Sequence, residues 1–297
     1  MPKTDPQTPP VATWSDLGTG APDETSPAGS STWYFRGHNF ALAYTTLVAG
    51  DALTRADQPD EYVVILPFDS CSVEVRAGDE AEKVTGRAVV MVPPGHSTIT
   101  AVEECTVVRL VSARSTDLIG RAGNAEAYRV PHPNVAPFAA WPDPPEGYRI
   151  RAYRLDDLTV TQDQVRPGQL LRCSTFMVNF LSPRIGPRDP DSLSPHHHDD
   201  FEQCSLAVEG EYVHHLRTPW SKSRREWRED EHVRCGSPSV AVIPPPMIHT
   251  SEAVGAGVNQ LIDIFCPPRL DFSLTPGRVL NEATYPLPQS PQSRRES

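Results

Sequence analysis

The sequence has no apolar run that approaches the roughly 20 residues a membrane-spanning helix needs. Its start, from Met1 to Pro10, is polar and proline-rich, with neither the basic residues nor the apolar stretch of a signal peptide. We therefore expect a cytoplasmic protein that does not enter a membrane. Positive charge is also sparse, because the formal net charge is −11 and the basic residues are scattered. Without a patch that neutralises phosphates, we expect no nucleic-acid partner.

Cysteine pairs and long helical periodicities are also missing. The six cysteines are spread singly, without a Cys-x-x-Cys pair, and most lie in or beside apolar stretches. This pattern favours buried, reduced thiols over disulfides or a zinc–thiolate site. Prolines are many, at 32 in 297 residues. The sequence therefore predicts an all-β chain with many turns.

Short apolar or alternating runs, separated by Gly, Asp and Pro clusters, fall into two groups along the chain. Low hydrophobic content at both ends predicts little ordered structure there. The expected segments are a flexible leader over 1–30, an N-terminal β-barrel over 31–113, a proline-rich connector over 114–148, a C-terminal barrel over 149–270 and a tail over 271–297.

The two groups of runs repeat one plan. Residues 60–66 correspond to 201–207, since each pairs an acidic start with an apolar strand. Residues 88–95 correspond to 239–246, since each is an apolar strand that ends in prolines. An internal duplication is the simplest account of this correspondence.

A cluster of histidines stands out in the second half. Residues 194–203 read Ser-Pro-His-His-His-Asp-Asp-Phe-Glu-Gln, and His249 follows three prolines at the end of an apolar strand. Because alternate residues of a strand point to the same face, His196 and His198 can both aim into a barrel while His197 points away. Imidazole and carboxylate together suit a divalent ion such as Zn, Fe, Mn or Ni. The alternatives are a polar loop for the first group and a core histidine for His249.

The third member of the candidate ligand set stays open between two neighbours. Glu202 lies an even number of steps from both His196 and His198. Gln203 needs a bulge in the preceding residues to reach the same interior. With His249, either choice leaves one or two positions on a five- or six-coordinate metal for a substrate.

Other residues near the motif are candidates for catalysis. One of His214 and His215 can face the cavity and move protons, while Arg217 holds a substrate carboxylate. The alternative is a histidine pair on the barrel rim, with Arg217 paired to a surface acid. Asn179 and Arg172 either line the same cavity or lie on a solvated face. In the charged segment that follows, Trp220 and Trp227 either form a lid or anchor the core.

These motifs resemble those of the cupin superfamily, and the doubled plan is similar to a bicupin. The family's first motif is His-x-His, an acid or amide four or five residues later and a closing glycine, and its second is Pro-x-Gly-x-x-His. The matching positions are His196, His198, Glu202 or Gln203 and Gly210, then Pro244, Pro246 in place of glycine, and His249. The resemblance implies two tandem double-stranded β-helix (jelly-roll) barrels.

The resemblance places a metal in the C-terminal barrel alone. The first barrel has no histidine before Asp60 at the motif's spacing, and Thr98 aligns with His249. A metal-dependent enzyme acting on a small carboxylate, enol or catechol-like metabolite is implied, first a non-haem dioxygenase with Fe(II) or Mn(II). The alternatives are a redox-neutral isomerase, lyase or aminohydrolase, with Zn(II) or Ni(II) possible as the ion, and a non-catalytic binding module. A homodimer or higher oligomer is expected, because such barrels pair through edge strands.

Overall fold

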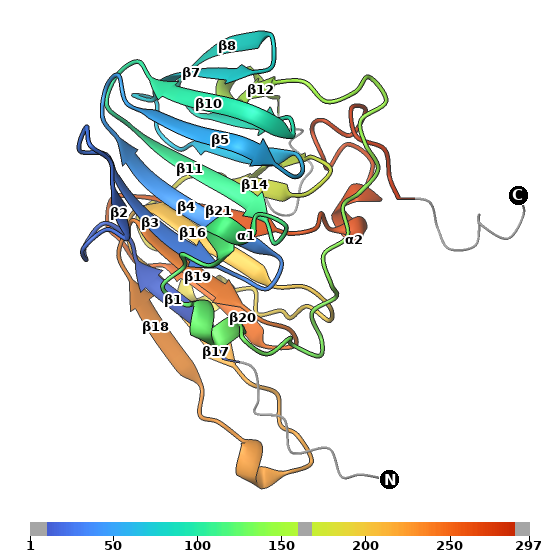
Figure 1. Cartoon of the computed structure of the whole chain (residues 1–297). Helices are drawn as coiled ribbons and strands as arrows, with labels where there is room; N and C mark the ends of the chain where they lie inside the picture. Colours follow the sequence, from blue (N-terminus) through green and yellow to red (C-terminus); the bar gives the residue numbers. More distant parts are fainter. Residues whose placement is uncertain (1–10, 160–167, 289–297) are drawn as a thin grey trace, which may run out of the picture.

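The protein is built from four antiparallel β-sheets, as the computed structural model of residues 11–159 and 168–288 shows (Figure 1). The expectation of an all-β chain is confirmed. The two α-helices are single turns, α1 (Thr116–Ile119) and α2 (Leu270–Ser273). Within the described residues, neither they nor any other helix has the length and apolarity needed to cross a bilayer. The outer parts of the expected leader and tail, 1–10 and 289–297, lie outside the described residues.

The first barrel consists of a seven-stranded and a four-stranded sheet. The larger sheet has the order β12-β9-β6-β11-β4-β3-β2. Its strands are β2 (Glu24–Thr25), β3 (Ser31–Arg36), β4 (Phe40–Leu47), β6 (Tyr62–Leu66), β9 (Ala88–Val92), β11 (Cys105–Ser112) and β12 (Arg151–Arg154). The smaller sheet has the order β5-β10-β7-β8, with β5 (Ala52–Gln58), β7 (Ser72–Ala77), β8 (Glu80–Thr85) and β10 (Gly95–Ala101).

The second barrel consists of a seven-stranded and a three-stranded sheet. The larger sheet has the order β1-β19-β16-β21-β14-β13, and β15 also pairs with β21. Its strands are β1 (Thr13–Asp16), β13 (Gly168–Arg172), β14 (Met177–Leu181), β15 (Arg184–Ile185), β16 (Gln203–Glu209), β19 (Ser239–Ile243) and β21 (Val258–Phe265). The smaller sheet has the order β18-β17-β20, with β17 (Tyr212–Arg217), β18 (Glu231–Cys235) and β20 (Ile248–Ala253).

The two large sheets pack face to face, and each small sheet closes its barrel from the outside (Figure 1). Val63 of β6 and Leu206 of β16 belong to one continuous core between the large sheets. Because side chains alternate along a strand, Val64 instead enters the core inside the first barrel. A strand of each large sheet is therefore buried on both faces, which explains runs such as Ala88–Val92 that are apolar throughout.

The strand registers show the internal duplication residue by residue. In the first barrel Val64 of β6 pairs with Arg109 of β11. In the second barrel Ser205 of β16 pairs with Asp263 of β21. In both barrels these two strands lie at the centre of the large sheet, so β6 matches β16 and β11 matches β21.

The segment boundaries differ from those expected from composition. Strand β1, inside the expected leader, pairs with β19 of the second barrel. Strand β12, inside the expected second barrel, pairs with β9 of the first. In the expected tail, Val279 and Tyr285 are fully buried. A short edge strand needs only a free sheet edge and an apolar anchor such as Leu17, which is buried, so mean composition does not reveal it.

All six cysteines are free and buried, as their positions in apolar stretches predicted. Cys204 on β16 and Cys266 just after β21 belong to the core between the large sheets. These thiols act as small apolar side chains in the packing.

Candidate metal centre

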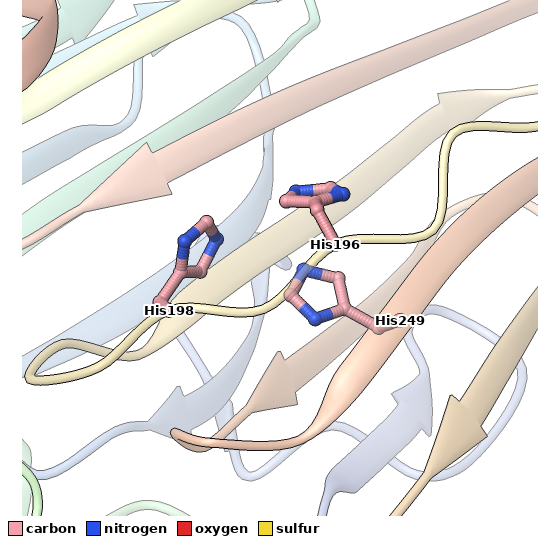
Figure 2. Close-up of side chains that lie close together, drawn as sticks. All are labelled: His196, His198 and His249. Carbon is pink, nitrogen blue, oxygen red and sulfur yellow. The ribbon is translucent and has the colours of Figure 1, made fainter.

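Three imidazoles meet inside the second barrel (Figure 2). The backbones of His196 and His249 form an isolated antiparallel bridge, with two N–H to O hydrogen bonds of 3.0 and 2.7 Å. His198 approaches from two residues further along. The ligating nitrogen atoms of the three rings all lie within 4.8 Å of one another. His197 is exposed, as alternation along the chain predicted.

Gln203 adds an amide oxygen to the three imidazoles. Its Oε1 lies 3.0 Å from Nε2 of His198 and 3.3 Å from Nε2 of His249. Its Nε2 donates to Ser205 Oγ at 3.1 Å and to Asp263 Oδ1 at 3.2 Å. Because an ionised carboxylate only accepts hydrogen bonds, Asp263 fixes the amide with its oxygen toward the histidines.

Glu202, the other candidate for the third ligand, does not lie beside the three histidines. Its carboxylate accepts hydrogen bonds from the backbone N–H of His38 at 2.7 Å and from Nδ1 of the same residue at 2.8 Å. No strand joins His198 to Glu202, so counting even steps between them does not apply. Strand β16 begins at Gln203, whose side chain enters the barrel, and its neighbour therefore faces the first barrel.

The protonation of the histidines fits a cation between these groups. Burial lowers the pKa of His249 to about 3 and that of His198 to about 4, so both rings are neutral at pH 7. The Nδ1 of His249 donates to the carbonyl of Met247 at 2.9 Å, which leaves a lone pair on Nε2. That lone pair faces the Gln203 amide oxygen. Two acceptors facing one another are stabilised by a positive ion held between them.

A cavity of about 270 Å³ opens beside His196, Gln203 and His249. Its charged lining side chains are Arg184, Arg188, Arg269, Arg278 and the carboxylate of Asp263. Asn179 also lines it, and the Oδ1 of this asparagine is buried without a hydrogen-bond partner among the described residues. Arg269 is paired with Asp271 outside the lining, and the other guanidinium groups still outnumber the carboxylate of Asp263, so the cavity favours an anion.

The proposed catalytic histidines lie outside the cavity lining. His214 is buried, and its Nδ1 lies 2.9 Å from the hydroxyl of Ser251. Burial lowers the pKa of His214 to about 4. His215 points to the other face of β17, where its Nε2 lies 2.9 Å from Glu252. Neither residue contributes to the cavity surface, although His214 faces the barrel interior.

Arg217 does not reach the cavity either. It forms an exposed ion pair with Asp230 across the base of the β17–β18 hairpin. The structure therefore supports the surface ion pair over a role in holding substrate. Arg172 is likewise turned away from the cavity, with its guanidinium 5.3 Å from the ring centre of Trp141.

The two tryptophans of the hairpin stack on one another. The ring centres of Trp220 and Trp227 are 4.5 Å apart and their planes differ by 9°. Trp220 is 75% exposed, so the pair does not anchor the core. Neither ring lines the cavity, and the hairpin projects from the end of the molecule (Figure 1).

The cavity residues that the sequence analysis missed lie outside the motifs. Arg184, on the two-residue strand β15, and Arg188 lie in the segment before the histidines, where no periodicity marks them. The sequence does mark Asp263, because it is the one charged residue in the mainly apolar run 258–265. A lone carboxylate in a strand that is otherwise buried commonly has a specific polar partner.

Compared with models of known protein families and with curated proteins, the sequence shows no match. Solved structures are nevertheless similar to the fold. A single-residue variant of oxalate decarboxylase from Bacillus subtilis is 15% identical with a TM-score of 0.56, covering 93% of this chain and 84% of the other. A formate complex of oxalate decarboxylase from Lactobacillus farciminis is 12% identical, with a TM-score of 0.54 and 81% of each chain covered. AerE from Microcystis aeruginosa is 11% identical with a TM-score of 0.55, covering 88% of this chain and 99% of the other.

At these identities the likeness concerns the fold. It spans most of the chain and therefore both barrels, so the expected doubled cupin architecture is confirmed.

Proposed function

We propose that this protein, whose fold is that of a bicupin, is an enzyme that holds one divalent metal ion in its second barrel. His196, His198, His249 and Gln203 would bind the ion. The convergence of three imidazoles on one amide oxygen beside a cavity carries the proposal. Fe(II) and Mn(II) are proposed first, with Zn(II) or Ni(II) as alternatives. The ion would act as a Lewis acid toward a substrate oxygen. Because the four proposed ligands carry no negative charge, the full charge of the ion would be available for this role.

The cavity supports a small anionic substrate, such as a metabolite with a carboxylate or an enolate oxygen. Arg184 and Arg188 line the wall on the side of the segment that precedes the histidines and would orient the anion. Asn179 offers an unoccupied carbonyl oxygen for a substrate hydroxyl. Asp263, the only carboxylate that the described residues contribute to the lining, replaces His214, His215 and Arg217 as the proposed ionisable group of the site.

The reaction we propose first is a dioxygenase-type oxidation, and the alternative is a redox-neutral isomerisation, elimination or amide hydrolysis. Both use the same ion and the same positive cavity. A non-catalytic binding module is the third candidate, and the metal ligand set argues against it, because binding an anion requires only the arginines.

Turnover with and without dioxygen separates these candidates. Protein loaded with Fe(II), Mn(II), Zn(II) or Ni(II) would be offered a panel of small carboxylates in air and under argon. An oxidoreductase consumes dioxygen with iron or manganese and stops under argon. Redox-neutral chemistry continues under argon. Binding of carboxylates without turnover under any of these conditions would contradict the enzyme proposal.

We also propose a homo-oligomer, a dimer or larger, that works in the cytoplasm without a nucleic-acid partner. Light scattering coupled to size exclusion would measure its mass against the 32.7 kDa of one chain.

A further inference from the structure

The first barrel has a different set of side chains where the second barrel has its histidines. The bridge between His249 and His196 in the second barrel corresponds to the pair Ser97 and Arg55 in the first. The residue that matches His249 is therefore Ser97, and the expected alignment with Thr98 is off by one. An arginine and a hydroxyl group occupy this position in place of two imidazoles.

The amide of the second barrel is also replaced by a hydroxyl group. Tyr62 begins β6 as Gln203 begins β16, and its hydroxyl lies 2.9 Å from Ser97 Oγ. Two hydroxyl groups that share one hydrogen bond use one of their two hydrogens for it. The other hydrogen is available to a further acceptor.

Arg109 reaches into the same barrel interior. Its neighbours along β11, Val107 and Val111, belong to the core inside the first barrel. So do the residues paired with it across the sheet, Ala43 and Val64. The arginine itself is only 5% exposed.

Glu24 is the carboxylate whose charge acts on Arg109, and it is shared with the ion pair to Arg121. Arg55 forms its ion pair with Asp117, and Arg121 forms one with Glu24. Among the described residues, Arg109 makes no ion pair, no hydrogen bond and no contact with an aromatic ring, and its Nε is buried without a partner. These three guanidinium groups and two carboxylates leave one positive charge uncompensated.

Such a charge is costly to bury. Burial lowers the pKa of Arg109, and the nearby charge of Arg55 acts in the same direction. Proteins pair buried charges or bind a counter-ion, because an unpaired ion loses its hydration without replacement. The groups that act in the opposite direction are the hydroxyl groups of Tyr34 and Tyr62 and, more weakly, the carboxylate of Glu24.

We propose that the interior of the first barrel binds one small monovalent anion against the guanidinium of Arg109. A carboxylate such as formate fits the forked donors of arginine, and a halide would offer the same charge. The remaining hydroxyl hydrogen of the Tyr62 and Ser97 pair would complete the site. This site is separate from the metal centre and does not depend on the proposed reaction.

Thermal unfolding tests the proposal on the full chain loaded with metal. Sodium formate or sodium chloride replaces sodium gluconate, whose anion is bulkier, at constant ionic strength. A ligand that binds the folded state alone raises the Tm as its concentration rises above its Kd. We expect a rise of several degrees in the unaltered protein and its loss in Arg109→Met.

The matched control is Arg76→Met, which removes an exposed guanidinium of the same barrel. This variant should keep the full response. A response that arises from the cavity of the second barrel would persist in both variants. A larger response to formate identifies a carboxylate site, and a larger response to chloride identifies a halide site. A response that is the same in Arg109→Met, or a protein that responds to neither salt, would overturn the proposal.

A crystal structure provides a test that does not depend on the stability of the variant. Crystals of the unaltered protein would be grown with formate or with bromide, whose anomalous scattering locates it directly. Density within hydrogen-bonding distance of the Arg109 guanidinium is expected with at least one of them. If neither anion is found at the guanidinium in crystals whose metal sites are occupied, the inference is contradicted.

Discussion

A single amide decides the charge of the candidate metal centre. Gln203 faces the histidines where a glutamate would add a negative charge, and Glu202 next to it is engaged by His38. The amide oxygen can be a ligand only if the amide does not flip. Asp263 and Ser205 hold it in that orientation.

Replacing Asp263 should therefore weaken metal binding without removing a ligand. In Asp263→Asn the new amide can both donate and accept, so Gln203 is free to turn its nitrogen toward the histidines. We expect metal affinity to fall about 10- to 100-fold, the usual effect of an outer partner of a ligand. Competition with a fluorescent chelator measures it.

Glu202→Gln is the matched control at the neighbouring residue. Its metal affinity should stay within about twofold of the unaltered protein, because the residue contacts His38 and not the metal centre. A loss of affinity as large as that of Asp263→Asn would show that Glu202 supports the site after all.

The sequence predicted the histidines but not the choice between Glu202 and Gln203. The histidine pattern is local, since alternation along a few residues selects His196 and His198. The choice of the next ligand depends on where β16 begins, and that is set by its pairing with β19 and β21. A shift of one residue in this register exchanges the two side chains.

At the scale of elements, two glutamates fasten the barrels to one another. Glu61, just before β6, accepts hydrogen bonds from the backbone N–H and hydroxyl of Ser174 at 3.0 and 2.8 Å. Glu202, just before β16, accepts from the backbone N–H and ring of His38. Each acid thus binds the turn between two strands of the opposite barrel. The duplicated plan makes these contacts reciprocal.

Glu61→Ala should destabilise the protein by about 2 to 4 kcal/mol. The variant leaves the buried N–H of Ser174 and the hydroxyl of Tyr285 without their acceptor, and each such group costs about 1 to 3 kcal/mol. Denaturant unfolding measures the change. Glu74→Ala, on strand β7 of the same barrel, removes a carboxylate paired only with the exposed Arg76 and is the control, which should leave stability nearly unchanged.

The same carboxyl group predicts a pH dependence. Burial raises the pKa of Glu61 above its ordinary value. A carboxyl whose pKa is raised by folding contributes stability that is present below its unfolded pKa and is lost as pH rises through its folded pKa. Glu61→Gln does not titrate, so its stability relative to the unaltered protein should increase as pH rises through that window. Unfolding curves from pH 4 upward would show no such trend if the group were already ionised in the folded protein.

Two arginines of the second barrel, which the sequence alone cannot distinguish, have different surroundings in the structure. Arg184 lines the cavity, whereas Arg217 pairs with Asp230 at the base of the hairpin. Arg184→Met should raise the KM for an anionic substrate at least tenfold, as expected for a lost charged contact. Arg217→Met should leave KM unchanged. Steady-state kinetics, or substrate binding by calorimetry, compares the two variants.

At the scale of the whole molecule, the fold was largely predictable and the exchange of strands was not. The repeated pattern of strands ending in prolines, with its histidine motif, predicted two barrels and their order. The pairing of β1 with β19 joins residues more than two hundred positions apart, and β12 returns to the first barrel after the connector. Such edge pairings depend on which sheet edges remain open in the folded chain, which no local pattern specifies.

The duplicated barrels have diverged in charge. In the second barrel, imidazoles and an amide lie beside a cavity. In the first barrel, arginines and hydroxyl groups are buried at the matching positions. One architecture thus supports a proposed cation site and a proposed anion site within a single chain.

Metal content tests most directly whether His196, His198 and His249 hold a metal ion. Elemental analysis of protein purified without a histidine tag, before and after reconstitution, should find about one divalent ion per chain. His196→Ala and His249→Ala should lose it, whereas His215→Ala, on the outer face of β17, should keep it. Absence of bound metal after reconstitution with Fe, Mn, Zn and Ni, or retention of a full equivalent in His249→Ala, would contradict the account.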